Sequence, residues 1–211
     1  SSTGLSTSLP ASGSNEAVTV AAYASYAPRP WYVDGALGYA YNWGSLARTI
    51  AFPGVFRTAQ GSPTANQFLA SAEAGRELAV ASRLSLTPFV RLEVSASGQN
   101  AFTETGAGAI SLNAQAQNTT GVRSLLGAEI ATALPLGETG ILSVAVRAGW
   151  AHDYADVTGA LTASFVGKPD TGFTVVGPAP DRNAALLGVS LNLPLSLGQA
   201  FVTYDATVAL S

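Results

Sequence analysis

Seven charged residues occupy alternate positions within stretches that also alternate apolar residues, so they can share one side of a sheet. The set contains five acids and two bases: Asp34, Glu73, Glu93, Glu129, Asp205, Arg91 and Arg147. Carboxylates and guanidinium groups on one face can form mutual salt bridges that stiffen a wall. They can instead form a hydrated surface of mixed charge, on which an extended chain would not stick at any one spot. The residue types leave both interpretations open.

Other residues with chemical potential do not form a convincing site. The single histidine, His152, lies beside Asp153, but a hydrolase triad also needs a serine nucleophile near the imidazole. We interpret His152 instead as part of a belt of rings at a membrane boundary, with Trp150 and Tyr154. Residues 106–111 half-resemble a phosphate loop but lack its third glycine and its strand–helix setting. One histidine and no cysteine leave no transition-metal cluster, so we expect no catalytic residue, no metal and no cofactor, and predict that the chain is not an enzyme.

The composition narrows the class of protein. Charged residues make up 11% of the 211 positions, against roughly 25% in a typical soluble domain. Hydrophobic residues make up 47%, yet no run of about 18 apolar residues exists to form a spanning helix. The net charge of −3 provides no broad basic field, so we expect no nucleic-acid partner, and we expect no small-molecule substrate either. Residues 1–15 are rich in Ser, Thr and Gly, and we interpret them as a flexible linker or loop remnant before a domain at 16–211.

The elements that must position the charged residues are eight stretches in which apolar and polar residues alternate. In 84–97, for example, Leu92 and its apolar neighbours share one parity, while Arg91 and Glu93 share the other. Successive side chains of a strand point to opposite faces, so each strand has one apolar and one polar face. The predicted strands are 16–26, 31–46, 67–79, 84–97, 122–134, 141–153, 183–193 and 199–210. The gaps alternate between tight turns and long loops, the long ones at 47–65, 98–121 and 154–182.

This pattern predicts an all-β fold, an antiparallel up-and-down transmembrane β-barrel meander. Tight turns at one rim, long loops at the other, and strands of about ten residues or more are typical of outer-membrane barrels. The lipid-facing positions would include Leu92, Val144, Val189 and Tyr204, and the seven charged residues would line the lumen. A soluble β-sandwich that binds a partner is the alternative, because sandwich strands also alternate. Soluble strands are shorter, however, and this chain has a single lysine, Lys168, for a water-exposed surface.

From about residue 31 onward the chain resembles the translocator β-domain of autotransporters, the proteins of type V secretion in Gram-negative bacteria. The order and spacing of several segments carry this resemblance: 31–39 (WYVDGALGY), 86–92 (LTPFVRL), 101–107 (AFTETGA), 123–128 (RSLLGA), 148–153 (AGWAHD), 173–177 (FTVVG), 181–184 (DRNA) and Tyr204-Asp205. The resemblance implies a twelve-stranded barrel of which eight strands are seen. We expect the first few strands, the last strand and the helix that links passenger to barrel to be missing.

The resemblance also implies a function. It suggests a pore and anchor in the bacterial outer membrane that supports export of an N-terminal passenger domain to the cell surface. The implied partners are outer-membrane lipid, the chain's own passenger polypeptide and the outer-membrane insertion machinery. A complete eight-stranded surface barrel, acting as an adhesin or structural anchor, remains the second hypothesis and requires its first and last strands to pair. The segment 102–104 would either extend a strand pair above the membrane or border the pore mouth.

Overall fold

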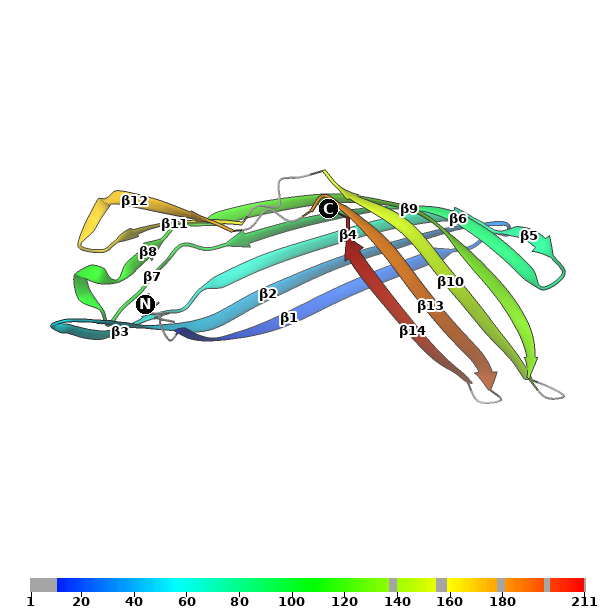
Figure 1. Ribbon diagram of the computed structural model, residues 1–211, viewed down its shortest axis with the longest axis horizontal. Helices are drawn as coiled ribbons and strands as arrows, with labels where there is room; N and C mark the ends of the chain where they lie inside the picture. Colours follow the sequence, from blue (N-terminus) through cyan, green and yellow to red (C-terminus); the bar gives the residue numbers. More distant parts are fainter. Residues whose placement is uncertain (1–10, 137–139, 155–158, 178–180, 196–197, 211) are drawn as a thin grey trace, which may run out of the picture.

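The main sheet is an antiparallel meander of eight long strands, as the alternation predicts (Figure 1). The computed structural model describes residues 11–136, 140–154, 159–177, 181–195 and 198–210. Strands that follow one another along the path pair directly, which makes the topology up-and-down. The strands, in spatial order, are β1 (Ala11–Tyr26), β2 (Trp31–Phe52), β4 (Thr64–Arg76), β6 (Leu84–Gln99), β9 (Gln117–Leu136), β10 (Gly140–Asp153), β13 (Asn183–Leu195) and β14 (Gly198–Ala209).

The connections at the two rims of the sheet differ in length, and the long connections at one rim consist mostly of further strands. The prediction that 47–65, 98–121 and 154–182 are loops is wrong, because hairpins and a short second sheet occupy much of these ranges. These elements are β3 (Val55–Gly61), β7 (Phe102–Thr103), the 3₁₀ turn η1 (Gly108–Ile110), β8 (Leu112–Ala114), β11 (Ala160–Phe165) and β12 (Lys168–Val176). They gather at the left of Figure 1, whereas β5 (Leu78–Ala81) lies at the opposite, short-turn rim.

The predicted linker at 1–15 is wrong in its last third. Strand β1 begins at Ala11 rather than at Glu16, and residues 11–15 pair with residues 44–48 of β2. Serine and glycine give these positions no apolar alternation, but the backbone of β2 continues beside them and offers hydrogen-bond partners. Residues 1–10 of the predicted linker lie outside the described residues.

The two faces of the sheet divide apolar from polar side chains. On one face, Leu92, Val189 and Tyr204 expose 48%, 45% and 70% of their surface, and Val144 is half-buried beside them. The other face carries the buried cluster of the main sheet, formed by Phe89, Leu125, Ala151 and Ala184 with Tyr32 and Leu186 packed against it. A soluble sandwich would bury its apolar faces, so the exposed apolar face contradicts the sandwich alternative.

The sheet is curled, and its two edge strands do not pair with each other in the described part of the chain. Strand β1 pairs only with β2, and β14 pairs only with β13. A closed eight-stranded barrel needs these edges to meet, and this structure does not contain that pairing. Within the described residues, the structure contains no helix that is long and apolar enough to cross a membrane.

Candidate functional site

The seven predicted charged residues lie on one face of the main sheet. Directly opposed residues in antiparallel strands project from the same face. Asp34 opposes Glu73, and Glu73 opposes Arg91 on the next strand. Glu129 opposes Arg147, and the next two positions across the sheet are Gly188 and Asp205. Glu93 follows Arg91 by two residues on β6 and therefore shares its face.

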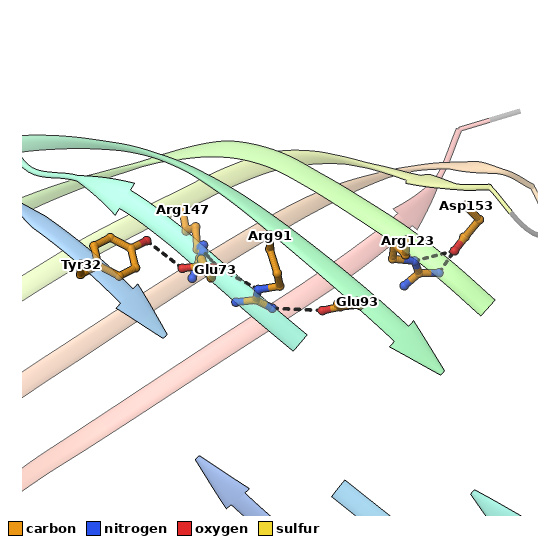
Figure 2. A network of polar contacts seen from close by, with 7 residues as sticks. All are labelled: Tyr32, Glu73, Arg91, Glu93, Arg123, Arg147 and Asp153. Atoms are coloured by element: carbon orange, nitrogen blue, oxygen red, sulfur yellow. Dashed lines mark hydrogen bonds and ion pairs between the residues drawn. The ribbon is translucent and has the colours of Figure 1, made fainter. Parts of the chain in front are cut away.

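Glu73 is the centre of a network of polar contacts on this face (Figure 2). Its carboxylate accepts a hydrogen bond of 2.7 Å from the Tyr32 hydroxyl. Arg91 Nε donates to Glu73 Oε2 at 2.7 Å, and Arg147 Nη2 donates to the same oxygen at 2.5 Å. Only 8% of the Glu73 side chain is exposed. A carboxylate buried to this degree needs compensating positive charge and hydrogen bonds, and this one has both.

The contact between Glu73 and Arg147 shows that the sheet curls toward the charged face. Two strands, β6 and β9, separate β4 from β10, so a flat sheet would place β10 about 14 Å away. Ala151, not Arg147, is level with Glu73, and the four-residue offset adds about 13 Å along the strand. The two side chains cannot span the resulting distance of roughly 19 Å in a flat sheet. The charged face is therefore the concave face.

The aromatic ring of Phe89 lies between the charged network and the backbone of the sheet. The Arg147 guanidinium lies over the Phe89 ring, with 3.6 Å between its Cζ atom and the ring centroid. The Phe89 ring crosses Gly127, where a Cβ would lie 2.5 Å from the ring's Cζ atom. Glycine at that position leaves room for the ring, and the ring offers its π face to the cation. The concave wall is thus two side chains thick at this level.

A second ion pair lies nearer the rim with the long hairpins. Arg123 binds Asp153 through two parallel hydrogen bonds of 2.9 and 2.8 Å (Figure 2). This pair and Glu93, at the edge of the Glu73 network, line a hollow of about 560 Å³. Small side chains contribute much of its lining, namely Ala21, Ala36, Gly38, Ser71, Ser95 and Gly121. The concave face therefore combines a filled region with an open one, whose lining is mostly apolar and has charged groups only at Glu93, Arg123 and Asp153.

The sequence-predicted set is brought together only in part. Glu73, Arg91 and Arg147 join in one network, and Glu93 reaches it through a 3.3 Å ion pair with Arg91. Asp34, Glu129 and Asp205 share the face but form no ion pair with any described residue.

Sequence reasoning missed four members of the site, namely Tyr32, Phe89, Arg123 and Asp153. A signal for three of them was available, because Tyr32, Arg123 and Asp153 have the parity of the predicted charged residues. Arg123 and Asp153 were not predicted because they lie at the ends of the predicted strands 122–134 and 141–153, although β9 in fact begins at Gln117. Phe89 escaped because an apolar residue on a polar face does not suggest a polar site.

The remaining candidate, His152, lies outside the Glu73 network and contacts an amide and two aromatic rings. His152 Nδ1 lies 2.9 Å from Asn183 Oδ1, and its ring lies between Trp150 and Tyr154, with centroids 5.5 and 4.8 Å away. The three predicted rings therefore lie together, and their place at a membrane boundary stays a prediction. In the part of the chain that the structure describes, no three His, Cys, Asp or Glu side chains are arranged to hold a metal ion.

Comparisons with known proteins agree with this geometry. The family model described as Autotransporter beta-domain matches residues 1–206. Among solved structures, the fold is similar to the translocator domain of autotransporter NalP from Neisseria meningitidis, with a TM-score of 0.63 and 17% sequence identity. The similarity covers 94% of this chain and 62% of that one, so this chain spans less than two thirds of the solved domain. A comparison with curated protein sequences finds no significant match.

Proposed function

The chain belongs to the autotransporter β-domain family, and from this premise we propose that its concave face lines part of a pore through which its own passenger polypeptide leaves the cell. The domain lies in the bacterial outer membrane. We propose that the convex face contacts lipid, that the outer-membrane insertion machinery assembles the domain, and that it has no catalytic activity. We further propose that the barrel domain includes residues 11–15, which continue strand β1.

The division between the faces carries the proposal. A concave face that bears carboxylates, guanidinium groups, serines and glycines suits contact with water and polypeptide. A convex face that bears Leu92, Val189 and Tyr204 suits contact with hydrocarbon, where an exposed polar backbone or charge is costly. In barrels of this kind a polar lumen and an apolar outer band alternate along each strand.

The two interpretations of the seven charges apply to different residues. The Glu73 network acts as a brace, because it ties β2, β4, β6 and β10 across the curvature of the wall. Asp34, Glu129 and Asp205 provide the hydrated, charged surface, since their carboxylates form no ion pair within the described chain. A passing polypeptide would meet several weak electrostatic contacts instead of one strong one.

The experiment compares one added charge on each face of strand β6 in the full-length precursor. Leu92, the ninth of the sixteen residues of β6, is exposed on the convex face, and Ser95 lines the concave hollow. An arginine facing lipid at mid-depth costs about 2–4 kcal/mol, whereas one in a water-filled lumen has little cost. Leu92→Arg should therefore reduce folded, membrane-inserted protein, and Ser95→Arg should insert normally.

The readouts are heat-modifiable migration of the barrel and protease accessibility of the passenger on intact cells. We expect Leu92→Arg to lose both signals and Ser95→Arg to keep the first. Normal insertion of Leu92→Arg together with failure of Ser95→Arg would reverse the assignment of the faces. A correctly inserted wild-type barrel that leaves its passenger inside the cell would reject the export function.

A further inference from the structure

The elements beyond the membrane-spanning part of the sheet join into a single unit, which we call the surface wall: β3, β7, η1, β8, β11 and β12. Strands β12, β11, β8 and β7 form one sheet in that order. Strand β3 joins them through the residue pair Gln60 and Thr105, whose backbones exchange two hydrogen bonds of 2.8 Å. Hairpins that are far apart in the sequence therefore lie side by side at the left of Figure 1.

The surface wall continues the barrel strands upward. Strand β2 has 22 residues, which corresponds to about 73 Å of extended chain. An apolar band about 25 Å tall, crossed at a tilt near 45°, needs only about 11 residues of strand. The last part of β2, from Leu46 to Phe52, pairs with β3. The β2–β3 hairpin thus rises from the rim of the barrel as an extension of its wall.

Glu104 connects the parts of the surface wall from its interior. Only 2% of the Glu104 side chain is exposed. Arg48 of β2 binds the carboxylate through one edge of its guanidinium, since Nη2 donates to Oε2 at 2.6 Å and Nε donates to Oε1 at 3.3 Å. The backbone N–H of Leu112 donates to the same carboxylate at 2.9 Å. One buried side chain therefore holds β2, the first residue of β8, and its own segment together.

Further contacts surround Glu104. Arg57 of β3 donates to the carbonyl of Ala107 at 2.7 Å. The N–H of Val166 donates to the carbonyl of Ser111 at 2.9 Å, which ties in the β11–β12 hairpin. Ala59, Ala107 and Ala163 expose none of their surface. Segments that open easily have few buried contacts and solvent-exposed backbone hydrogen bonds. The residues around Glu104 instead have buried side chains and an extensive set of hydrogen bonds.

We propose that the surface wall is a fixed rim of the pore mouth, locked by the positioning residue Glu104, and that the passenger leaves past it without any hairpin opening. This inference rests on the proposed export function and adds the part that stays still. A hinged lid over the mouth would instead have to break the contacts of Glu104, Arg48 and Arg57 in each export event. The segment 102–104 thus combines the two roles considered for it, since it extends the wall and borders the mouth.

The decisive experiment fastens the surface wall with a disulfide in the full-length precursor. Gln60 and Thr105 form a hydrogen-bonded antiparallel pair, whose Cα atoms are typically about 5.5 Å apart and so within the range of a disulfide. This chain contains no cysteine, so a Gln60→Cys/Thr105→Cys pair introduces no competing partner within it. We expect the disulfide to form and the amount of passenger on the surface to be the same with and without reductant.

Two results would overturn the fixed rim. Export that falls in the oxidised variant and recovers with reductant would show that the hairpins must separate. Absence of the disulfide in a variant that still exports would show that β3 and residue 105 are not neighbours. A wild-type protein that inserts but exports nothing would reject the export function itself, which keeps the two failures apart.

A second variant tests the role of Glu104. In Glu104→Gln the Arg48 charge loses its buried partner, so we expect proteinase K to cleave segment 102–114 on intact cells roughly 100-fold faster than in wild type. The barrel should keep its heat-modifiable migration. Adding the oxidised Gln60→Cys/Thr105→Cys pair to the same chain should restore resistance, because the disulfide replaces the missing lock. Glu77→Gln, at an exposed glutamate near the opposite rim, is the control and should be cleaved at the wild-type rate. Unchanged cleavage of Glu104→Gln would reject the lock.

Discussion

Replacement of Glu73 by glutamine tests the curvature of the sheet most directly. Glutamine preserves the volume of the side chain and one acceptor oxygen, but it removes the negative charge that Arg91 and Arg147 share. Its amide also directs a donor toward one of the guanidinium groups. The two arginine side chains are 31% and 21% exposed, so water screens their charges only in part.

The magnitude follows from the burial of the carboxylate. Loss of one partner from a buried ion pair typically costs about 3–5 kcal/mol, because the remaining charge is left uncompensated. We expect Glu73→Gln to lose about 3 kcal/mol, near the lower end, since the Tyr32 hydroxyl can still donate to the amide oxygen. Glu129→Gln is the matched control. Glu129 shares the concave face but forms no ion pair with a described residue, so its loss should cost less than about 1 kcal/mol.

The assay is urea titration of the membrane-inserted precursor, with the folded fraction measured by heat-modifiable migration. A double-mutant cycle with Arg147→Met separates the direct contact from general damage. Because the two side chains meet only if β4 and β10 curl toward each other, the cycle should give a coupling of about 1–3 kcal/mol. Additive effects, or a Glu73→Gln loss no larger than that of Glu129→Gln, would refute both the contact and the curvature argued from it.

Two further predictions use the same titration. Gly75→Ala should destabilise the barrel by about 1–3 kcal/mol, because the added Cβ would lie within 3 Å of the Tyr32 ring; Gly35→Ala, whose Cβ would be 3.9 Å from its nearest neighbour, is the control and should change little. Arg123→Ala should cost at most about 1 kcal/mol, because 42% of the Arg123 side chain is exposed where it pairs with Asp153. That cost should shrink further in high salt, and a salt-independent loss would contradict a solvated pair.

The eight long strands and their two faces could be predicted because alternation is a local property of the chain. Each strand must present apolar side chains to one environment and polar ones to the other, so Arg91 and Leu92 already separate the faces. The pairing of neighbours then follows from the meander. The same reasoning could place Glu73 and Arg147 on one face, but not in contact, since they are 74 residues apart and meet only through curvature.

The surface wall could not be predicted, because its strands are stabilised by partners and not by their own pattern. Strand β12 contains Pro169 and Gly172, both of which are typical of loops, yet it pairs with β11 along most of its length. The first five residues of strand β1 are likewise held in an extended conformation by pairing with the backbone of β2. In both places tertiary hydrogen bonds outweigh a weak local preference.

Exceptions to the alternation are more informative than the alternation itself. Phe89 and Leu125 are apolar residues on the polar, concave face. Strict alternation would place apolar residues only on the convex face. They are among the few buried side chains of the main sheet, and the guanidinium of Arg147 covers the Phe89 ring. A large apolar side chain on a polar face therefore marks a level at which a second layer of side chains covers the wall. Leu69, which shares that face and lines the hollow, has no such cover and exposes 45% of its surface.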